Sequence, residues 1–131
     1  MDLFDYFEKT RGFGVLATAD GEGHVNAAVY SRPHILEKNT AGFIMRDRLT
    51  HANLQTNSKA VYLFREEGEG YTGKRLYLEK LSEEMETRRL YELKRRPLSP
   101  GGEEEEEDHR FLVIFKITRV LSLIGGEEEE D

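Results

Sequence analysis

Apolar residues at the start of the chain recur with the period of a helix. Over residues 2–10 one broad face collects four large side chains, Leu3, Phe4, Tyr6 and Phe7. This spacing predicts an N-terminal helix. Asp2 is suited to cap its first turn, and Gly12 is suited to end it.

Most of the remaining apolar residues form short runs or alternate with polar ones, which is typical of β-strands. Two such segments, 13–19 and 24–31, flank the sequence DGEG and predict a hairpin with an Asp-Gly turn. Residues 33–36 continue the extended chain. Further strands are expected at 42–46, 59–66, 74–81 and 109–124. The first strand is apolar on both faces, as in a barrel wall that is covered from outside.

Two shorter patterns predict helices inserted between these strands. A short helix is expected to end near residue 57, and a second over 82–96. Ser82 would cap the second, which has acids in its first turn and bases in its last, as the helix dipole favours. Residues 95–108 contain two prolines and two glycines and read as a linker. The fold class is therefore mainly β (α+β): a small antiparallel barrel of six strands with an N-terminal helix and one or two inserted helices.

Charge is distributed unevenly along the chain. The runs EEEEED at 103–108 and EEEED at 127–131 carry six and five negative charges, so a total of −7 leaves +4 on the other residues. A mildly basic body can attract an anion. We expect one domain over 1–124 with an inserted acidic loop at 101–108, and a disordered acidic tail at 125–131. In an alternative interpretation, the acidic runs mimic a polyanion toward a basic partner.

Several classes of chemistry find no support in the composition. The chain has no cysteine, and no stretch approaches the roughly 20 apolar residues of a membrane span. Its first residues are acidic where a signal peptide is basic. The four histidines, at 24, 34, 51 and 109, show no metal-ligand spacing. We therefore expect a cytoplasmic protein with no metal site and no membrane contact.

The segment GFIMRDRLTHANLQTN at 42–57 is the clearest candidate for a binding site. It predicts a strand that delivers Arg46 and Arg48 to a helix N-terminus capped by Thr50. Leu49 and Leu54 would form a hydrophobic staple across this start, and Asn57 would end the helix in a left-handed conformation. Helix amides and two guanidiniums together suit a phosphate. The plainer alternative is that Thr50 only satisfies backbone groups, and that the arginines pair with nearby acids such as Asp47, Glu66 and Glu67.

The order of these segments resembles the FMN-binding split-barrel family related to pyridoxamine 5'-phosphate oxidase. The resemblance rests on the N-terminal helix, on GFGVLATADGEGHVNAAVY, and on FIMRDRLTHANLQTNSKAVYLF. It extends over residues 4–81 and more loosely through the last strand. The resemblance implies a homodimer with FMN in a groove between two barrels. It places the FMN phosphate at Arg46, Arg48, Thr50 and His51, and the flavin ring at Asn26, Ala27, Ala28 and Val29.

Small side chains on the second strand fit that placement, because a flat ring can approach the backbone closely. The alternative for Ala27 and Ala28 is tight packing inside a narrow barrel. Many relatives carry Lys or Arg four residues before the helix leucine, where this chain has Thr50. Vitamin B6 oxidation is not expected, because the acidic ending IGGEEEED would repel a phosphorylated substrate.

Several functions remain open from the sequence. The first is a flavin-dependent oxidoreductase acting on a small molecule, for which Tyr30, His34 and Tyr71 are acid–base candidates by residue type only. The second is a non-catalytic flavin-binding protein or electron carrier. The third is a split barrel that binds another flat cofactor, a deazaflavin or haem, although no histidine stands in a haem-binding context. Nucleic-acid binding is disfavoured, because aromatic residues are not interleaved with basic ones.

Overall fold

The computed structural model describes residues 2–93, 109–126, 128 and 129. In this part of the chain seven strands and three helices follow one another. Their order and bounds are α1 (Leu3–Lys9), β1 (Gly12–Ala19), β2 (Val25–Val29), β3 (His34–Glu37), β4 (Thr40–Arg46), α2 (Leu49–Thr56), β5 (Lys59–Glu66), β6 (Gly73–Met85), α3 (Arg88–Leu93) and β7 (Arg110–Ser122).

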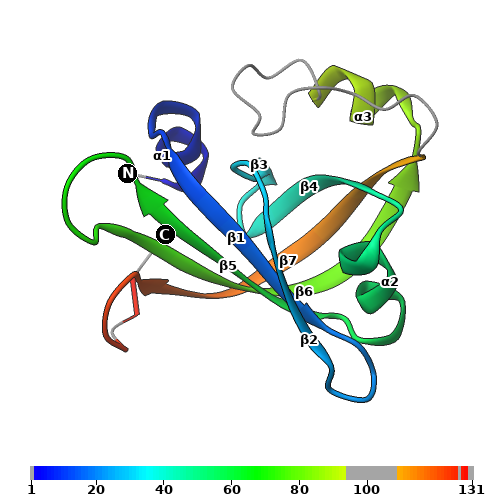
Figure 1. Cartoon of the computed structure of the whole chain (residues 1–131). Coiled ribbons are helices and arrows are strands. Elements are labelled where there is room, and N and C mark those ends of the chain that lie inside the picture. The colour runs from blue at the N-terminus through cyan, green and yellow to red at the C-terminus, as the bar shows by residue number, and fades with distance from the viewer. Residues whose placement is uncertain (1, 94–108, 127, 130–131) are drawn as a thin grey trace.

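All seven strands form one sheet in the order β2-β1-β5-β6-β7-β4-β3, and every neighbouring pair is antiparallel. The expected fold class is confirmed in outline, with seven strands instead of six. The additional strand is β3, whose residues were expected only as extended chain. It counts as a strand because it pairs with β4, where His34 lies opposite Gly42. Figure 1 shows the strongly twisted sheet, with α1 beside the start of β1 and α2 beside the β1–β2 hairpin.

The main apolar core lies on the face of the twisted sheet that α1 packs against. Helix α1 contributes Leu3, Tyr6 and Phe7, all buried as predicted, whereas Phe4, expected on the same face, is 52% exposed. The ring of Phe7 meets that of Phe64 edge to face, with centroids 5.3 Å apart. The Asp2 cap is confirmed, since its carboxylate accepts a hydrogen bond of 2.8 Å from the backbone N–H of Asp5.

A smaller core lies on the opposite face of β4 and β7. Leu90 of α3 packs there with Leu112 and Ile114 of β7. The strand β7 is therefore buried on both faces, which explains why nearly every residue from 110 to 115 is apolar.

The prediction of a helix from Ser82 is wrong. Strand β6 runs on to Met85, and Ser82 lies opposite Ile114 of β7 after an irregularity in register at residues 80–82. The hydrogen bonds of a long strand pair outweigh the local cap signal. Helix α3 begins only at Arg88, and the expected linker at 95–108 lies outside the described residues.

Part of the C-terminal acidic segment lies against the sheet. Glu128 pairs with Arg119 at 2.6 Å, and Glu129 forms an ion pair with Lys74. The backbone N–H of Glu129 also donates to the carbonyl of Val120. The expected disorder at 125–131 therefore does not apply to these two residues. The acidic loop at 101–108 lies outside the described part of the chain.

Within the described ranges, no helix is both long enough and apolar enough to cross a membrane.

Candidate functional site

The candidate site is built around the junction between β4 and α2. Arg48 stands at the N-cap position in an extended conformation, and Leu49 is the first residue of the helix. The expectation that Thr50 caps the helix is therefore wrong. Leu49 is inside the helix and 58% exposed, so it does not form the expected staple with Leu54. Thr50 instead turns into the protein, where it is 4% exposed and hydrogen-bonds Tyr30.

The start of this helix carries positive charge, and Asp47, just before the N-cap, places a carboxylate oxygen 3.2 Å from His51 Nδ1. Among the described residues, α2 has no side-chain cap hydrogen bond and no acid in its first turn. Its first amides point outward with the positive end of the helix dipole, and Arg48 adds a full charge. The start of an eight-residue helix with these features favours the binding of an anion.

The other end of α2 also differs from expectation. Asn57 is extended, with φ −147°, and not left-handed. Its N–H donates to the carbonyl of Asn53 at 3.0 Å, so the helix closes without a left-handed residue.

Two buried hydrogen bonds connect α2 to the β1–β2 hairpin. The amide of Asn53 donates to the hydroxyl of Thr18 at 3.0 Å, and Thr18 lies opposite Asn26. The contact of Thr50 with Tyr30 forms the second. Burial raises the pKa of the Tyr30 hydroxyl, against the smaller opposing effect of Thr50, so Tyr30 stays protonated at neutral pH. The structure thus brings the start of α2 next to β2.

Both ring nitrogens of His51 have carboxylate partners, and its ring stacks on another aromatic ring. Its Nε2 lies 3.0 Å from Glu83 Oε2, its Nδ1 lies 3.2 Å from Asp47 Oδ1, and its ring stacks on Phe111 with centroids 3.8 Å apart. His51 is 7% exposed. Any contact it makes with an anion would come from its backbone N–H.

Glu83 is the centre of this network. Burial alone would raise the pKa of its carboxyl, but hydrogen bonds from Lys80, His51 and Gln55 outweigh burial and lower the pKa to about 2. Lys80 lies 2.6 Å from Glu83 Oε1. Sequence reasoning missed this partner of His51, because 32 residues separate the two and only the extension of β6 brings them together.

Arg46 leaves β4 on the face opposite Met45. Met45 belongs to the inner core, and side chains alternate along a strand. Arg46 lies opposite Arg110 of β7, which is 7% exposed. Arg110 is a further positive group at this strand end, and no spacing in the sequence connects it with Arg46.

The strand β2 forms one edge of the sheet. Its exposure alternates, with Val25, Ala27 and Val29 outward and Asn26 and Ala28 half-buried. Ala27 lies opposite Ala17 and Val29 opposite Val15 of β1. Small and apolar side chains therefore border a backbone edge that pairs with no other described strand.

The structure gathers some of the predicted residues and separates others. Thr50 and Tyr30 meet, while the side chain of Arg46 leaves β4 on the face opposite the core residue Met45. His34 lies in β3. Tyr71 is 72% exposed, and Arg65 lies over its ring at 5.6 Å.

Three residues with metal-binding side chains meet in the β1–β2 turn, namely Asp20, Glu22 and His24. The carboxylate of Asp20 accepts hydrogen bonds of 2.9 Å from the backbone N–H groups of both other residues. These hydrogen bonds are those of a capped surface turn, and they account for the proximity of the three side chains.

No protein-family model and no curated protein matches the sequence. The structure is similar to that of an FMN-binding protein from Syntrophomonas wolfei subsp. wolfei, with a TM-score of 0.72 and 22% identity over 95% of this chain and 85% of that one. It is similar to a putative pyridoxamine 5'-phosphate oxidase from Lactobacillus delbrueckii (TM-score 0.62, 15% identity, 90% of this chain and 88% of that one). It is also similar to an F420 reductase (TM-score 0.60, 14% identity, 92% and 98%). The chain therefore shares its fold with structures that include an FMN-binding protein and a pyridoxamine 5'-phosphate oxidase-like protein, as its resemblance to the split-barrel family predicted.

Proposed function

We propose that this protein binds FMN, with the phosphate at the start of α2 and the ring beside β2, and that it acts as a flavin-dependent oxidoreductase on a small molecule. The observation that carries the proposal is the start of α2, which in the described part of the chain has no side-chain cap hydrogen bond, no acid in its first turn and Arg48 at its cap position. Likeness in fold to an FMN-binding protein supports it.

The phosphate would be held mainly by backbone groups and charge. The N–H groups of Thr50 and His51 belong to the first turn of α2. The guanidinium of Arg48 and, from the strand end, that of Arg46 would supply the counter-charge. The side chains of Thr50 and His51 would act indirectly, by fixing the turn in place through Tyr30 and Glu83.

The ring would lie beside Asn26, Ala27, Ala28 and Val29. Ala27 and Ala28 leave room for a flat ring, and the unpaired edge of β2 can hydrogen-bond its polar rim. Bound flavin would supply the redox chemistry, while these residues bind, orient and shield it. The protonated hydroxyl of Tyr30 lies between β2 and α2 and would serve as a hydrogen-bond donor.

A homodimer completes the proposal. One face of β2, β1 and β5 carries exposed and half-buried apolar side chains, which we call the outer face: Val15, Ala17, Ala27, Val29 and Leu63. Val29 is 52% and Leu63 38% exposed. A patch of this kind marks an interface, and a second copy would cover it and enclose the ring.

The visible absorption spectrum of the purified protein, before and after FMN is added, tests the proposal directly. We expect a bound-flavin spectrum and saturable binding. Arg48→Ala should weaken FMN binding about tenfold, and the double variant Arg46→Ala/Arg48→Ala more strongly. Arg88→Ala on α3 removes an exposed arginine elsewhere and should leave the affinity unchanged. Equal affinities in all variants would place the phosphate elsewhere.

Oxidation of NADH or NADPH by the flavin-loaded protein separates the enzyme from an electron carrier. We expect turnover with at least one small acceptor; failure with every acceptor would favour the carrier. A deazaflavin is the second candidate cofactor, since a structure of similar fold is an F420 reductase. Titration with a deazaflavin alongside FMN would rank the two by affinity.

A further inference from the structure

One side of the last strand, β7, is paired over only part of its length. Strand β4 runs beside its first half, and the register of that pair ends at Lys116. The backbone N–H of Ile117 still donates to the carbonyl of Asn39, but the sheet has no described strand farther along this side of β7. An open edge of this kind can accept an additional strand through its backbone groups.

The C-terminal segment of the chain occupies this edge. It turns back after β7, as the red end of the chain in Figure 1 shows. Glu128 lies opposite Leu121 in an antiparallel bridge, and the backbone N–H of Glu129 donates to the carbonyl of Val120 at 2.8 Å. Two acidic residues are thus held in the position of one more strand.

Each of these two acids meets a cation. Glu128 Oε1 lies 2.6 Å from Arg119 Nε, and Glu129 forms an ion pair with Lys74. Arg119 lies opposite Tyr77 of β6, and Lys74 stands three residues before Tyr77, so the two cations lie on opposite faces of the sheet. Successive side chains of a strand also point to opposite faces. A pair of neighbouring glutamates in an extended segment therefore matches both cations.

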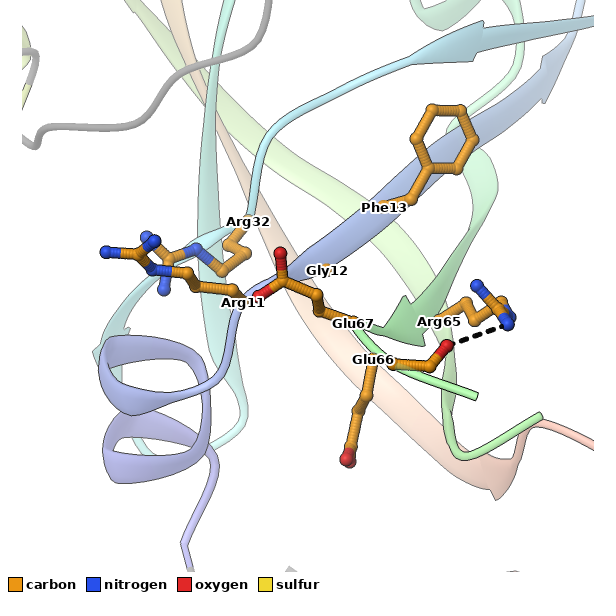
Figure 2. A pocket seen from close by; sticks show the side chains of 8 residues that line it. Arg11, Gly12, Phe13, Arg32, Arg65, Glu66 and Glu67 are labelled. Atoms are coloured by element: carbon orange, nitrogen blue, oxygen red, sulfur yellow. Dashed lines mark hydrogen bonds between the residues drawn. The ribbon is translucent and has the colours of Figure 1, made fainter. Parts of the chain in front are cut away.

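Lys74 is positioned by residues outside the acidic segment. Its Nζ lies 4.8 Å from the centre of the Tyr6 ring, and the hydroxyl of Tyr6 donates to the carboxylate of Glu66 at 2.6 Å. In Figure 2, which shows the pocket at the start of β1, this carboxylate points away from Arg11 and Arg32. The face of an aromatic ring attracts an ammonium without neutralising it. The Tyr6 ring therefore holds the charge of Lys74 at the edge that the acidic segment occupies.

We propose that this edge of β7 is a docking site for an extended acidic segment of another protein, which adds to the sheet as a strand. The C-terminal segment competes for the same edge from within the chain. Charge complementarity and the backbone pairing of Glu128 and Glu129 carry the proposal. The side chains of Arg119 and Glu128 are 47% and 63% exposed, and exposed ion pairs are weak, so a partner can displace the segment.

Fluorescence anisotropy of a labelled peptide, GGEEEED, tests the inference on the full-length protein. The peptide repeats residues 125–131. A short tether gives the C-terminal segment an effective concentration in the millimolar range, so its binding within the chain implies a Kd below about 1 mM for the free peptide. Removing the competing charges should expose the edge. We expect the variant Glu128→Gln/Glu129→Gln to bind the peptide at least about tenfold more tightly than the parent protein does.

The two cations should determine this binding. When added to the doubly substituted variant, Lys74→Gln and Arg119→Gln should each weaken peptide binding about fivefold. Lys59→Gln and Arg88→Gln remove a lysine and an arginine that pair with acids elsewhere, and they should have no effect. The neutral peptide GGQQQQN should bind at least about tenfold more weakly than the acidic one. Circular dichroism of each variant checks that the fold is retained.

The inference fails if the doubly substituted variant shows no saturable peptide binding up to about 1 mM, or if the neutral peptide binds as tightly as the acidic one. Equally tight binding of a short oligothymidylate would also overturn it, because the edge would then be a general site for polyanions. A change in the mass of the protein on Glu128→Gln/Glu129→Gln substitution, seen in size-exclusion chromatography, would show that the segment is exchanged between two copies. The natural occupant would then be a second copy of this chain.

Discussion

The imidazole of His51 is surrounded by Glu83, Asp47 and the ring of Phe111. A buried imidazole with two carboxylate partners ties α2 to the end of β6 and the start of β7. It therefore supports the candidate site from behind instead of entering it. The same holds for Thr50, whose hydroxyl is used by Tyr30.

Replacing Glu83 tests this network at the scale of one residue. Glu83→Gln should lower the free energy of unfolding by about 1–3 kcal/mol, because charge-assisted hydrogen bonds to His51 and Lys80 are lost in a poorly exposed position. Denaturant titration measures the change. As a control, Glu79→Gln on the same strand, β6, removes an exposed partner of Lys59 and should cost clearly less than Glu83→Gln. Equal costs would contradict the special position of Glu83.

The depressed pKa of Glu83 also predicts a pH dependence. The pKa is about 2 in the folded protein against a usual 4.5, so the folded state favours the ionised form. The stabilisation is complete above pH 4.5 and is lost as the pH falls toward 2. Unfolding of the parent protein and of Glu83→Gln should therefore differ most at pH 5 and above, and converge near about pH 2. A difference that grows on acidification would refute this assignment.

At the scale of elements, the residue at the N-cap of α2 is not one that stabilises a helix start. A cationic residue stands where Ser, Thr, Asp or Asn would be preferred. Arg48→Asp should therefore stabilise the flavin-free protein by about 1 kcal/mol and weaken FMN binding. Thermal unfolding and flavin titration of the same variant measure both effects. A variant that is more stable and binds FMN as before would show that the phosphate does not lie here.

Two cap signals in the sequence had different outcomes, and a pair of variants compares them. Asp2 caps α1, so Asp2→Ala should cost about 1 kcal/mol of stability. Ser82 lies in β6 and is exposed, so Ser82→Ala should change stability by less than about 0.5 kcal/mol. Denaturant titration of both variants checks the contrast, and a similar loss in each would contradict the strand assignment of Ser82.

At the scale of the whole molecule, the outer face predicts self-association. Val29→Glu places a charge in the middle of this apolar surface and should convert a dimer to a monomer in size-exclusion chromatography with mass detection. Phe4→Glu changes an apolar residue of similar exposure on α1 and should leave the mass unchanged. A parent protein that is already a monomer would remove the basis of the homodimer proposal.

The local patterns of the sequence were sufficient for most elements. Periodic apolar residues predicted α1, the β1–β2 hairpin and the strands β4, β5 and β7, because alternation and helical spacing report directly on one buried face. The arginines, the small residues of β2 and the short helix were also visible in the sequence. Their common neighbourhood followed only from the resemblance to a known family.

The tertiary structure decided the features that depend on contacts between residues far apart in the sequence. Whether residues 82–85 form a strand depended on β7, whose partner positions lie about 30 residues further along the chain. The same extension of β6 placed Glu83 against His51 and so withdrew that imidazole from the candidate phosphate site. Local propensities are weaker than the tertiary contacts of a long strand pair, and these contacts cannot be read from neighbouring residues. The sequence by itself therefore determined which chemical groups this protein has, and the fold determined which of them face the site.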